Sequence, residues 1–246
     1  MMVITSETKI CDIAVEYPTA IPVLERLGID YCCGGKHTLA EACARKSLHL
    51  APVLAELELQ QQDTSLPEAQ WQQAPLKKLA AYVVQQHHAF TRDQIKLIGD
   101  LLSKVEVRHG ADHAEVFEIS KVFAAISSEL THHFFCEETI LFPYIGTLDA
   151  DQPPASPPVF GNVEQPITRM MTDHDQAGEE LRELRELSNN YTPPPAACPT
   201  WRALYRALED LERDLHQHIH LENNILFPRA LARAGKQSGK SIMECA

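Results

Sequence analysis

The stretch that decides the fold is His133–Pro143, HFFCEETILFP, because it recurs in outline 85 residues later as His218–Pro228, HIHLENNILFP. In each copy a histidine stands four residues before a glutamate, inside an apolar pattern of helical period. Side chains at positions i and i+4 project from one face of a helix, so they can reach the same metal or neighbouring metals. A unit used twice in this way predicts two facing helices that supply two histidines and two carboxylates to one buried point.

The composition is that of an ordinary globular chain. Its 246 residues are 44% hydrophobic and 23% charged, and the formal net charge is −12. An acidic balance argues against nucleic acid or an anionic membrane as a partner. The first residues show neither a basic nor an apolar region of a signal peptide, and no apolar run has the length of a membrane span, so we expect a cytoplasmic protein. Seven cysteines, an odd number, favour free thiols over a disulfide framework.

Helical spacing dominates the chain and strand patterns are scarce, so the sequence predicts an all-α protein. We expect a small helical N-terminal domain, a polar linker, an up-down four-helix bundle and a flexible tail. Their predicted ranges are 1–60, 61–74, 75–234 and 235–246.

Prolines and glycines, which interrupt or end helices, place the helices within these ranges. In the small domain, a helix from Ile10 to Leu27 should end near Gly28 and be interrupted by Pro18 and Pro22, and a second helix should begin at Thr38. In the bundle, the four predicted helices cover approximately residues 75–106, 113–146, 165–190 and 200–233.

Apolar ladders in the second and fourth bundle helices separate core histidines from surface ones. The core-facing positions are Ile119, Phe123, Ile126, Leu130, His133, Glu137, Ile140 and Tyr144, and Leu204, Leu208, Leu211, Leu215, His218, Glu222 and Ile225. Two buried carboxylates and two buried imidazoles are costly without compensation, and metal cations provide it. His132, His216 and His220 fall off these ladders, so we expect them on a solvated face.

The other two helices each add one candidate histidine. His174 lies on the ladder of the third helix, where a single buried histidine is usually a satisfied core residue, but two His-x-x-x-Glu pairs opposite it favour a ligand. In the first helix His87 and His88 belong to two different ladders, and periodicity does not choose between them. The spacing of 86 residues from His88 to His174, close to the 85-residue repeat, slightly favours His88.

The resulting donor set contains four imidazoles and two carboxylates. Zinc closes its sites with four ligands, and ferritin-type bundles use a Glu-x-x-His motif in place of this one. Histidine with bridging carboxylates suits iron, with manganese or adventitious zinc as alternatives.

At this point the sequence resembles the haemerythrin-like bundle and, more closely, the repair-of-iron-centres family of the YtfE/ScdA type. The resemblance covers nearly the whole chain, including YCCGGK at Tyr31–Lys36 and LENNILFP at Leu221–Pro228. It implies two non-haem iron ions bridged by both glutamates and an oxo or hydroxo group. It also implies a ligand set of His88, His133, Glu137, His174, His218 and Glu222.

The same resemblance implies a cytoplasmic protein that repairs iron–sulfur clusters after nitrosative or oxidative damage, by iron donation or nitric oxide handling. Damaged iron–sulfur proteins, nitric oxide and oxygen are then the implied partners, and homodimerisation is left open. Two alternatives also remain open. One is an enzyme that reduces nitric oxide, and the other is a sink or sensor that binds nitric oxide or oxygen without turnover.

Four further residues complete the candidate site. Where oxygen-carrying haemerythrins add a second histidine in the third helix, this chain has Gly178, which leaves positions on the metals open. Glu129 and Asp173 lie near the ligands in sequence, either lining access to the metals or accepting hydrogen bonds from the imidazoles. The adjacent Cys32 and Cys33 can form a vicinal disulfide, ligate a metal or undergo nitrosation, and the resemblance implies a role in redox exchange or iron transfer. The alternative is two small packed residues in a tight turn.

Overall fold

The computed structural model describes residues 2–60, 71–149 and 161–243, with side chains up to Gly235. Most of the predicted linker, 61–70, and the end of the predicted tail, 244–246, lie outside this range. The described residues form helices and one isolated bridge between Lys9 and Thr38, which confirms the all-α prediction. Among the described helices, none combines the length and the hydropathy needed to cross a membrane.

The chain divides into two compact units, one of Met1–Leu79 with His216–Ala246 and the other of Ala80–Leu215. In the first unit the short helices are α1 (Ile10–Glu16), η1 (Pro18–Ala20), α2 (Ile21–Arg26), α3 (Leu39–Arg45) and α4 (Leu50–Gln60). Their buried side chains, among them Ile10, Leu24 and Leu57, form a core of their own.

The predicted helix 10–27 is divided as its prolines require. Pro18 opens the 3₁₀ turn η1, and Pro22 lies in the first turn of α2, where its missing N–H costs nothing. Gly28 then ends the helix with a left-handed φ of 64°. The second predicted helix starts where expected, because Thr38 and Glu41 form a reciprocal capping box at the N terminus of α3.

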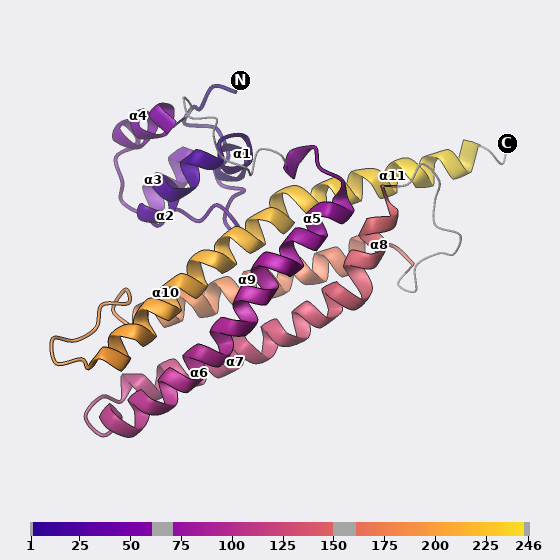
Figure 1. Cartoon of the computed structure of the whole chain (residues 1–246). Coiled ribbons are helices and arrows are strands. Elements are labelled where there is room, and N and C mark those ends of the chain that lie inside the picture. The colour runs from indigo at the N-terminus through magenta and orange to yellow at the C-terminus, as the bar shows by residue number, and fades with distance from the viewer. Residues whose placement is uncertain (1, 61–70, 150–160, 244–246) are drawn as a thin grey trace. The chain divides into compact units, whose positions relative to one another are not determined.

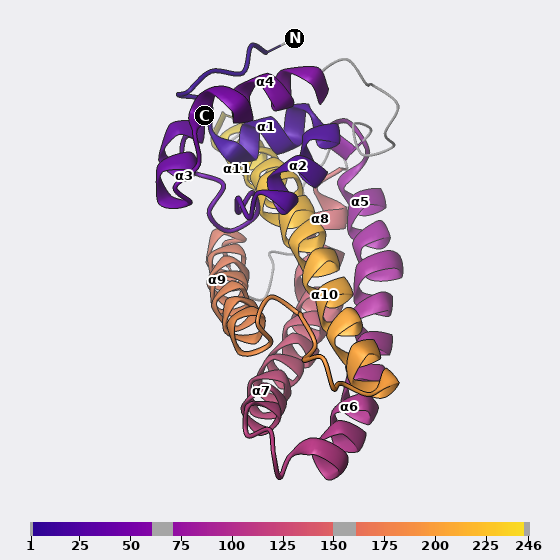
Figure 2. The same ribbon diagram turned by 90° about the vertical axis from the view of Figure 1, so that its left-hand side faces the viewer.

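The long helices follow the predicted order, and three of them contain a π-helical turn. Figures 1 and 2 show them running alternately up and down. The segments are α5 (Leu76–Val83), η3 (Val84–His88) and α6 (Ala89–His109), then α7 (Glu115–Cys136), η4 (Glu137–Leu141) and α8 (Phe142–Thr147), then α9 (Glu164–Leu187), and finally α10 (Pro199–His220), η5 (Leu221–Leu226) and α11 (Phe227–Met243). Helix α11 therefore contains most of the predicted tail.

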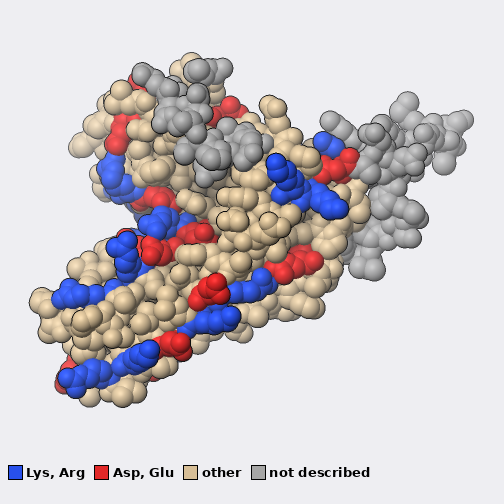
Figure 3. All heavy atoms as spheres, in the orientation of Figure 1, with Lys and Arg blue, Asp and Glu red and all other residues tan. Residues whose placement is uncertain are grey.

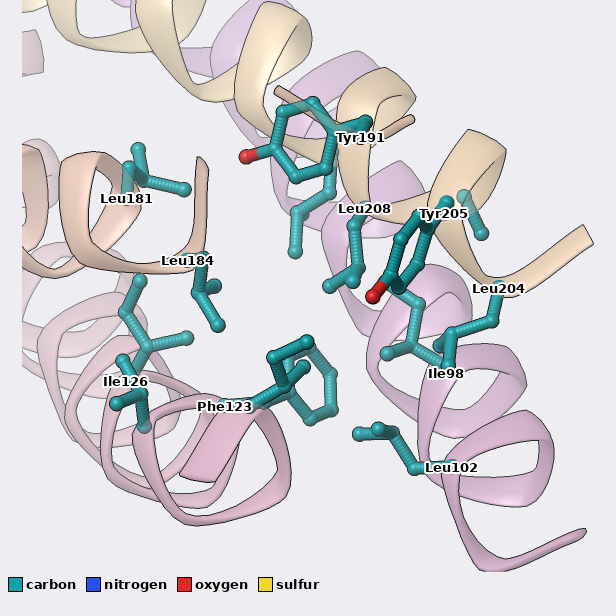
Figure 4. Close-up of a cluster of buried hydrophobic side chains, with 14 of the residues drawn as sticks. Ile98, Leu102, Phe123, Ile126, Leu181, Leu184, Tyr191, Leu204, Tyr205 and Leu208 are labelled. Atoms are coloured by element: carbon teal, nitrogen blue, oxygen red, sulfur yellow. The ribbon is translucent and has the colours of Figure 1, made fainter. Parts of the chain in front are cut away.

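One apolar core joins α6, α7, α9 and the part of α10 within the second unit. Figure 4 shows side chains of these four helices pointing toward one another. The labelled aliphatic and aromatic members are Ile98, Leu102, Phe123, Ile126, Leu181, Leu184, Leu204 and Leu208, with Tyr191 and Tyr205 beside them. On α7 the ladder of this core leads through Ile126 and Leu130 to His133.

The π turns explain where the predicted ladders fail. A π turn carries an extra residue, so it rotates the following residues around the helix axis. Within η4, Ile140 is 43% exposed whereas Leu141 is buried, and after η4 Tyr144 is only half-buried whereas Ile145 is buried. The prediction that Ile140 and Tyr144 face the core is therefore wrong, and the residues that follow them, Leu141 and Ile145, occupy the core positions.

In the first helix the same effect removes the choice between two ladders. Before η3 the buried residues Ala80 and Val83 follow the ladder of His87, and after it Ile98 and Leu102 follow the ladder of His88. Both histidines are buried at the π turn where one ladder gives way to the other.

Apart from the buried Glu137, Glu212 and Glu222, the Asp, Glu, Lys and Arg side chains of the described residues are at least partly exposed. Figure 3 shows basic and acidic side chains interspersed on the face it presents, with neither sign forming a continuous patch there. Many are paired along a helix, as Arg169 with Asp173 and Arg182 with Glu179. Such pairs contribute little to stability individually.

Candidate metal centre

Within Ala80–Leu215, three elements bring three histidines to one glutamate. Glu137 is the first residue of η4, and the i,i+4 spacing places His133 Nε2 3.2 Å from its Oε1. His88, from η3, has Nε2 3.3 Å from Oε2 of the same carboxylate. His174 of α9 completes the set, with Nε2 3.0 Å from His133 Nε2.

The second copy of the repeat has the same internal geometry. His218 Nε2 lies 2.9 Å from Glu222 Oε1, and both side chains are buried. Two groups of potential ligand residues result, and within each group the ligand atoms all lie within 4.8 Å of one another. The first group is His88, Glu137, His218 and Glu222, and the second is His133, Glu137, His174 and Glu222. Both glutamates belong to both groups, and the members of the two groups are the six residues that the resemblance implies as ligands.

The donor chemistry fits a pair of metal cations. The two oxygens of Glu137 are buried and have no hydrogen-bond donor within the described residues, although imidazole nitrogens face both of them. A buried carboxylate in this state is costly unless cations occupy the space between it and the imidazoles. The two oxygens pointing to different histidines suit a carboxylate that bridges two metals.

His87 and His88 have separate roles despite their common burial. His88 contributes Nε2 to the first group, whereas the His87 ring turns to Asp214, with 3.0 Å between Nδ1 and Oδ1. His87 is thus a core histidine paired with a carboxylate, and it belongs to neither group of ligands.

The predicted surface histidines divide differently. His132 is exposed as expected, and His216 is half-buried. His220 is buried, so its predicted solvated position is wrong, because Tyr31 and Asn224 of the same unit cover it. Burial lowers the pKa of His220 to about 4, which keeps this imidazole neutral at pH 7.

The two acidic residues predicted near the ligands are placed unequally. Asp173 lies 3.5 Å from His133 Nδ1 and accepts a 2.9 Å hydrogen bond from Arg169. The hydrogen bond from His133 lowers the Asp173 pKa more than its partial burial raises it, and Arg169 lowers it further. Glu129 is exposed and accepts hydrogen bonds from Gln176 at 2.7 and 2.8 Å.

A third carboxylate, Glu138, was not predicted. Its Oε1 lies 2.7 Å from His88 Nδ1 and accepts a 2.8 Å hydrogen bond from Arg92. Burial raises the Glu138 pKa, but the hydrogen bonds and charges of His88 and Arg92 outweigh it, so the pKa is lowered. Periodicity did not predict this role, because Glu138 is not a member of the apolar ladder. It contacts His88 from η4, while His88 lies in η3.

The Cys32–Cys33 turn holds two thiols that are not joined in a disulfide, with 3.9 Å between the sulfurs. Asp30 organises the turn by accepting hydrogen bonds from both backbone N–H groups, at 3.0 and 2.9 Å. Cys32 is buried, and its hydrogen bond with Cys33, its burial and the nearby Asp30 raise the pKa of its thiol well above the usual range. Gly35 is required here, because an added Cβ would lie 2.6 Å from the Tyr31 carbonyl oxygen.

The helical fold and the paired His-x-x-x-Glu segments define a haemerythrin-type metal-binding bundle. Residues 79–230 match the model of the Hemerythrin HHE cation binding domain, and residues 6–61 match ScdA_N, described as a domain of unknown function (DUF542).

Full-length relatives narrow the class. The chain is 39% identical over 222 residues to the iron-sulfur cluster repair protein YtfE of Escherichia coli O157:H7, covering 90% of this chain and 95% of that protein. It is 37% identical over 221 residues to the protein of the same name from Pectobacterium atrosepticum, covering 89% and 95%. The chain belongs to the YtfE family of iron–sulfur cluster repair proteins.

Proposed function

We propose that this protein repairs damaged iron–sulfur clusters and carries two non-haem iron ions. The observation that carries the proposal is the pair of buried ligand groups that share Glu137 and Glu222. His88 and His218 would hold one iron and His133 and His174 the other, with an oxo or hydroxo group as a third bridge. The printed name of the relatives supports the repair role.

When bound, the iron pair would supply redox chemistry and exchangeable iron, and the residues of this chain set the conditions for both. Burial of the imidazoles and carboxylates excludes water, and the rigid helices fix the donor atoms before metal binds. Damaged iron–sulfur proteins are the proposed partners, with iron donation or nitric oxide handling as the proposed means.

Reactivation of a cluster enzyme tests this function. An iron–sulfur dehydratase damaged by nitric oxide should recover faster with the anaerobically purified, iron-loaded protein than with an equal amount of ferrous salt. The control is the Glu137→Ala variant, which removes a shared carboxylate. Equal recovery with the protein and with ferrous salt would contradict a repair role.

A second candidate is reduction of nitric oxide at the same centre. Each ligand group holds four side chains, fewer than the six positions of octahedral iron, so a coordination position for a small molecule would stay open even with a bridging oxo or hydroxo group. A multiple-turnover assay with nitric oxide and a reductant distinguishes an enzyme from a protein that only binds nitric oxide. Product beyond one equivalent per centre supports an enzyme, and saturation at one equivalent supports a sink or sensor that also binds oxygen.

We also propose that Cys32 and Cys33 act in thiol exchange or iron handover. Cys33 is the more exposed thiol and Cys32 the buried one. Replacing both with serine should leave the iron content unchanged, since all six proposed ligands lie beyond residue 75, and should slow repair. Full repair by the double variant would mean that the turn has only a structural role. Loss of iron would contradict the division into a separate domain 1–60 and bundle 75–234.

A further inference from the structure

Two of the proposed ligand histidines are each backed by a carboxylate, and each carboxylate is held by an arginine. On the side of Nδ1, His88 faces Glu138, which Arg92 holds. His133 faces Asp173, which Arg169 holds. The two chains of contacts have the same chemistry but unequal lengths.

The contact to His88 is the stronger of the two. Glu138 Oε1 lies 2.7 Å from His88 Nδ1, within the range of a charge-assisted hydrogen bond, whereas Asp173 Oδ2 lies 3.5 Å from His133 Nδ1, at its outer limit. The side chain of His88 is also fully buried.

Aromatic contacts fix the His88 ring further. It stacks on Phe134 at a centroid distance of 4.0 Å and an interplanar angle of 10°, with Phe142 at 5.9 Å. Arg92, which holds Glu138, lies over the Phe134 ring at 5.5 Å. Imidazole, carboxylate and guanidinium therefore have little freedom to rearrange.

This arrangement sets which nitrogen of His88 is free to bind a metal. His88 Nδ1 lies within hydrogen-bond range of a Glu138 oxygen, and a proton held there would leave Nε2 with its lone pair for a metal. Nε2 is the atom that faces Glu137 Oε2 at 3.3 Å. Such a carboxylate partner orients a ligand imidazole and increases its basicity, and losing it typically costs about 10–100-fold in metal affinity.

We propose that Glu138, held by Arg92, is a positioning residue for His88, and that it makes the position of His88 and His218 the more tightly metal-binding of the two. The inference rests on the proposed two-metal centre. In the second copy of the repeat the residue after the shared glutamate is Asn223, which is neutral, so the repeat supplies this carboxylate once.

Stepwise release of ferrous iron to a chromogenic chelator tests the inference on the anaerobically loaded, full-length protein. The wild type should release its two irons in a fast and a slow step. Glu138→Leu should accelerate the slow step by about 10–100-fold, and Glu138→Gln, which keeps an acceptor without the charge, should have an intermediate effect. The matched variant Asp173→Asn should change mainly the fast step, and by less.

A second measurement does not depend on iron. Ring-nitrogen NMR of the metal-free, histidine-labelled chain should show His88 as the single Nδ1–H tautomer in the wild type and a mixture of tautomers in Glu138→Leu. Thermal unfolding controls for the fold, and if the leucine variant does not fold, the glutamine variant still carries both readouts.

The outcomes separate the inference from the proposed function. A wild-type chain that binds no pair of metals would contradict the centre itself. A wild type with two irons, combined with an unchanged slow step or an unchanged tautomer in the Glu138 variants, would overturn only the role of Glu138. A larger effect of Asp173→Asn on the slow step would reverse the order of the two positions.

Discussion

The two copies of the repeat, 133–143 and 218–228, share their inward chemistry and differ in their outward faces. Each supplies a histidine, a glutamate one turn later, a π turn and a proline two residues after that turn. In the first copy Phe135 is 59% exposed and Ile140 43%, whereas their counterparts His220 and Ile225 are each 4% exposed.

The cover of the second copy includes Tyr31, which lies in the segment between α2 and α3 of the same unit. Asn224 donates a 3.0 Å hydrogen bond from Nδ2 to the Tyr31 carbonyl oxygen, and the Tyr31 ring meets His220 edge-on at 5.4 Å. The Cys32–Cys33 turn follows Tyr31 directly. The comparison shows that the metal-binding face of the motif does not depend on what covers its outer face.

The largest effect should come from the residues that the copies have in common. Glu137→Ala and Glu222→Ala should each reduce the iron content from about two to less than one per chain, because each carboxylate belongs to both ligand groups. Metal analysis and the visible spectrum measure this, with exposed Glu118→Ala as the control. Retention of both irons by either variant would refute the bridging assignment.

The next effect should separate the adjacent histidines of η3. His88→Ala should lower the iron occupancy, whereas His87→Ala should keep the iron and lower the free energy of unfolding by about 1–3 kcal/mol, because it leaves Asp214 without its ring partner. Iron analysis combined with denaturant unfolding measures both quantities. Equal iron loss in the two variants would mean that the ligand assignment at this π turn is wrong.

A smaller effect should separate the outer faces of the two copies. Asn224→Ala should lower the free energy of unfolding by about 1–2 kcal/mol, because the amide bonds both the Tyr31 carbonyl and His220 Nδ1. Thr139, its counterpart in the first copy, is exposed, so Thr139→Ala should change it by less than about 0.5 kcal/mol. Equal free energies of unfolding for the two variants would mean that the contacts of Asn224 do not stabilise the second copy.

The smallest effect concerns the thiols next to that cover. Cys33 should be alkylated first at neutral pH, since the thiolate reacts and the raised pKa keeps Cys32 protonated. For a thiol whose pKa is higher in the folded than in the unfolded chain, stability is complete below the unfolded pKa of about 8.5 and declines above it. Mass spectrometry from pH 7 to 10 should show that the alkylation rate of Cys32 increases only at higher pH than that of Cys33. Equal rates for the two thiols would contradict the protection of Cys32.

Sequence periodicity predicted the fold because long amphipathic helices leave a strong signal in a single chain. The four helices, their order and the ladders that lead to His133 and His218 all follow from apolar spacing. Chemistry then selected the candidate ligands, since a charged or polar residue on a buried ladder needs a partner.

The remainder depended on contacts that spacing does not encode. The π turns shifted Ile140 outward and brought both His87 and His88 inward, and a single sequence offers no count of residues per turn. Glu138 reaches a histidine 50 positions away, and His220 is buried by Tyr31, 189 positions away. Tertiary packing decided these cases over local pattern.

The π turns also have a consequence for how this chain tolerates insertions and deletions. Each one works as a one-residue insertion that the helix has absorbed without breaking. Deleting a single residue such as Thr139 from η4 would let the helix revert to uniform winding with the residues after it still facing the same way, so the change would fall on the turn itself, where Glu137 and Glu138 lie. Relatives of this chain should therefore keep the number of residues through η3, η4 and η5 even where the identities of those residues drift.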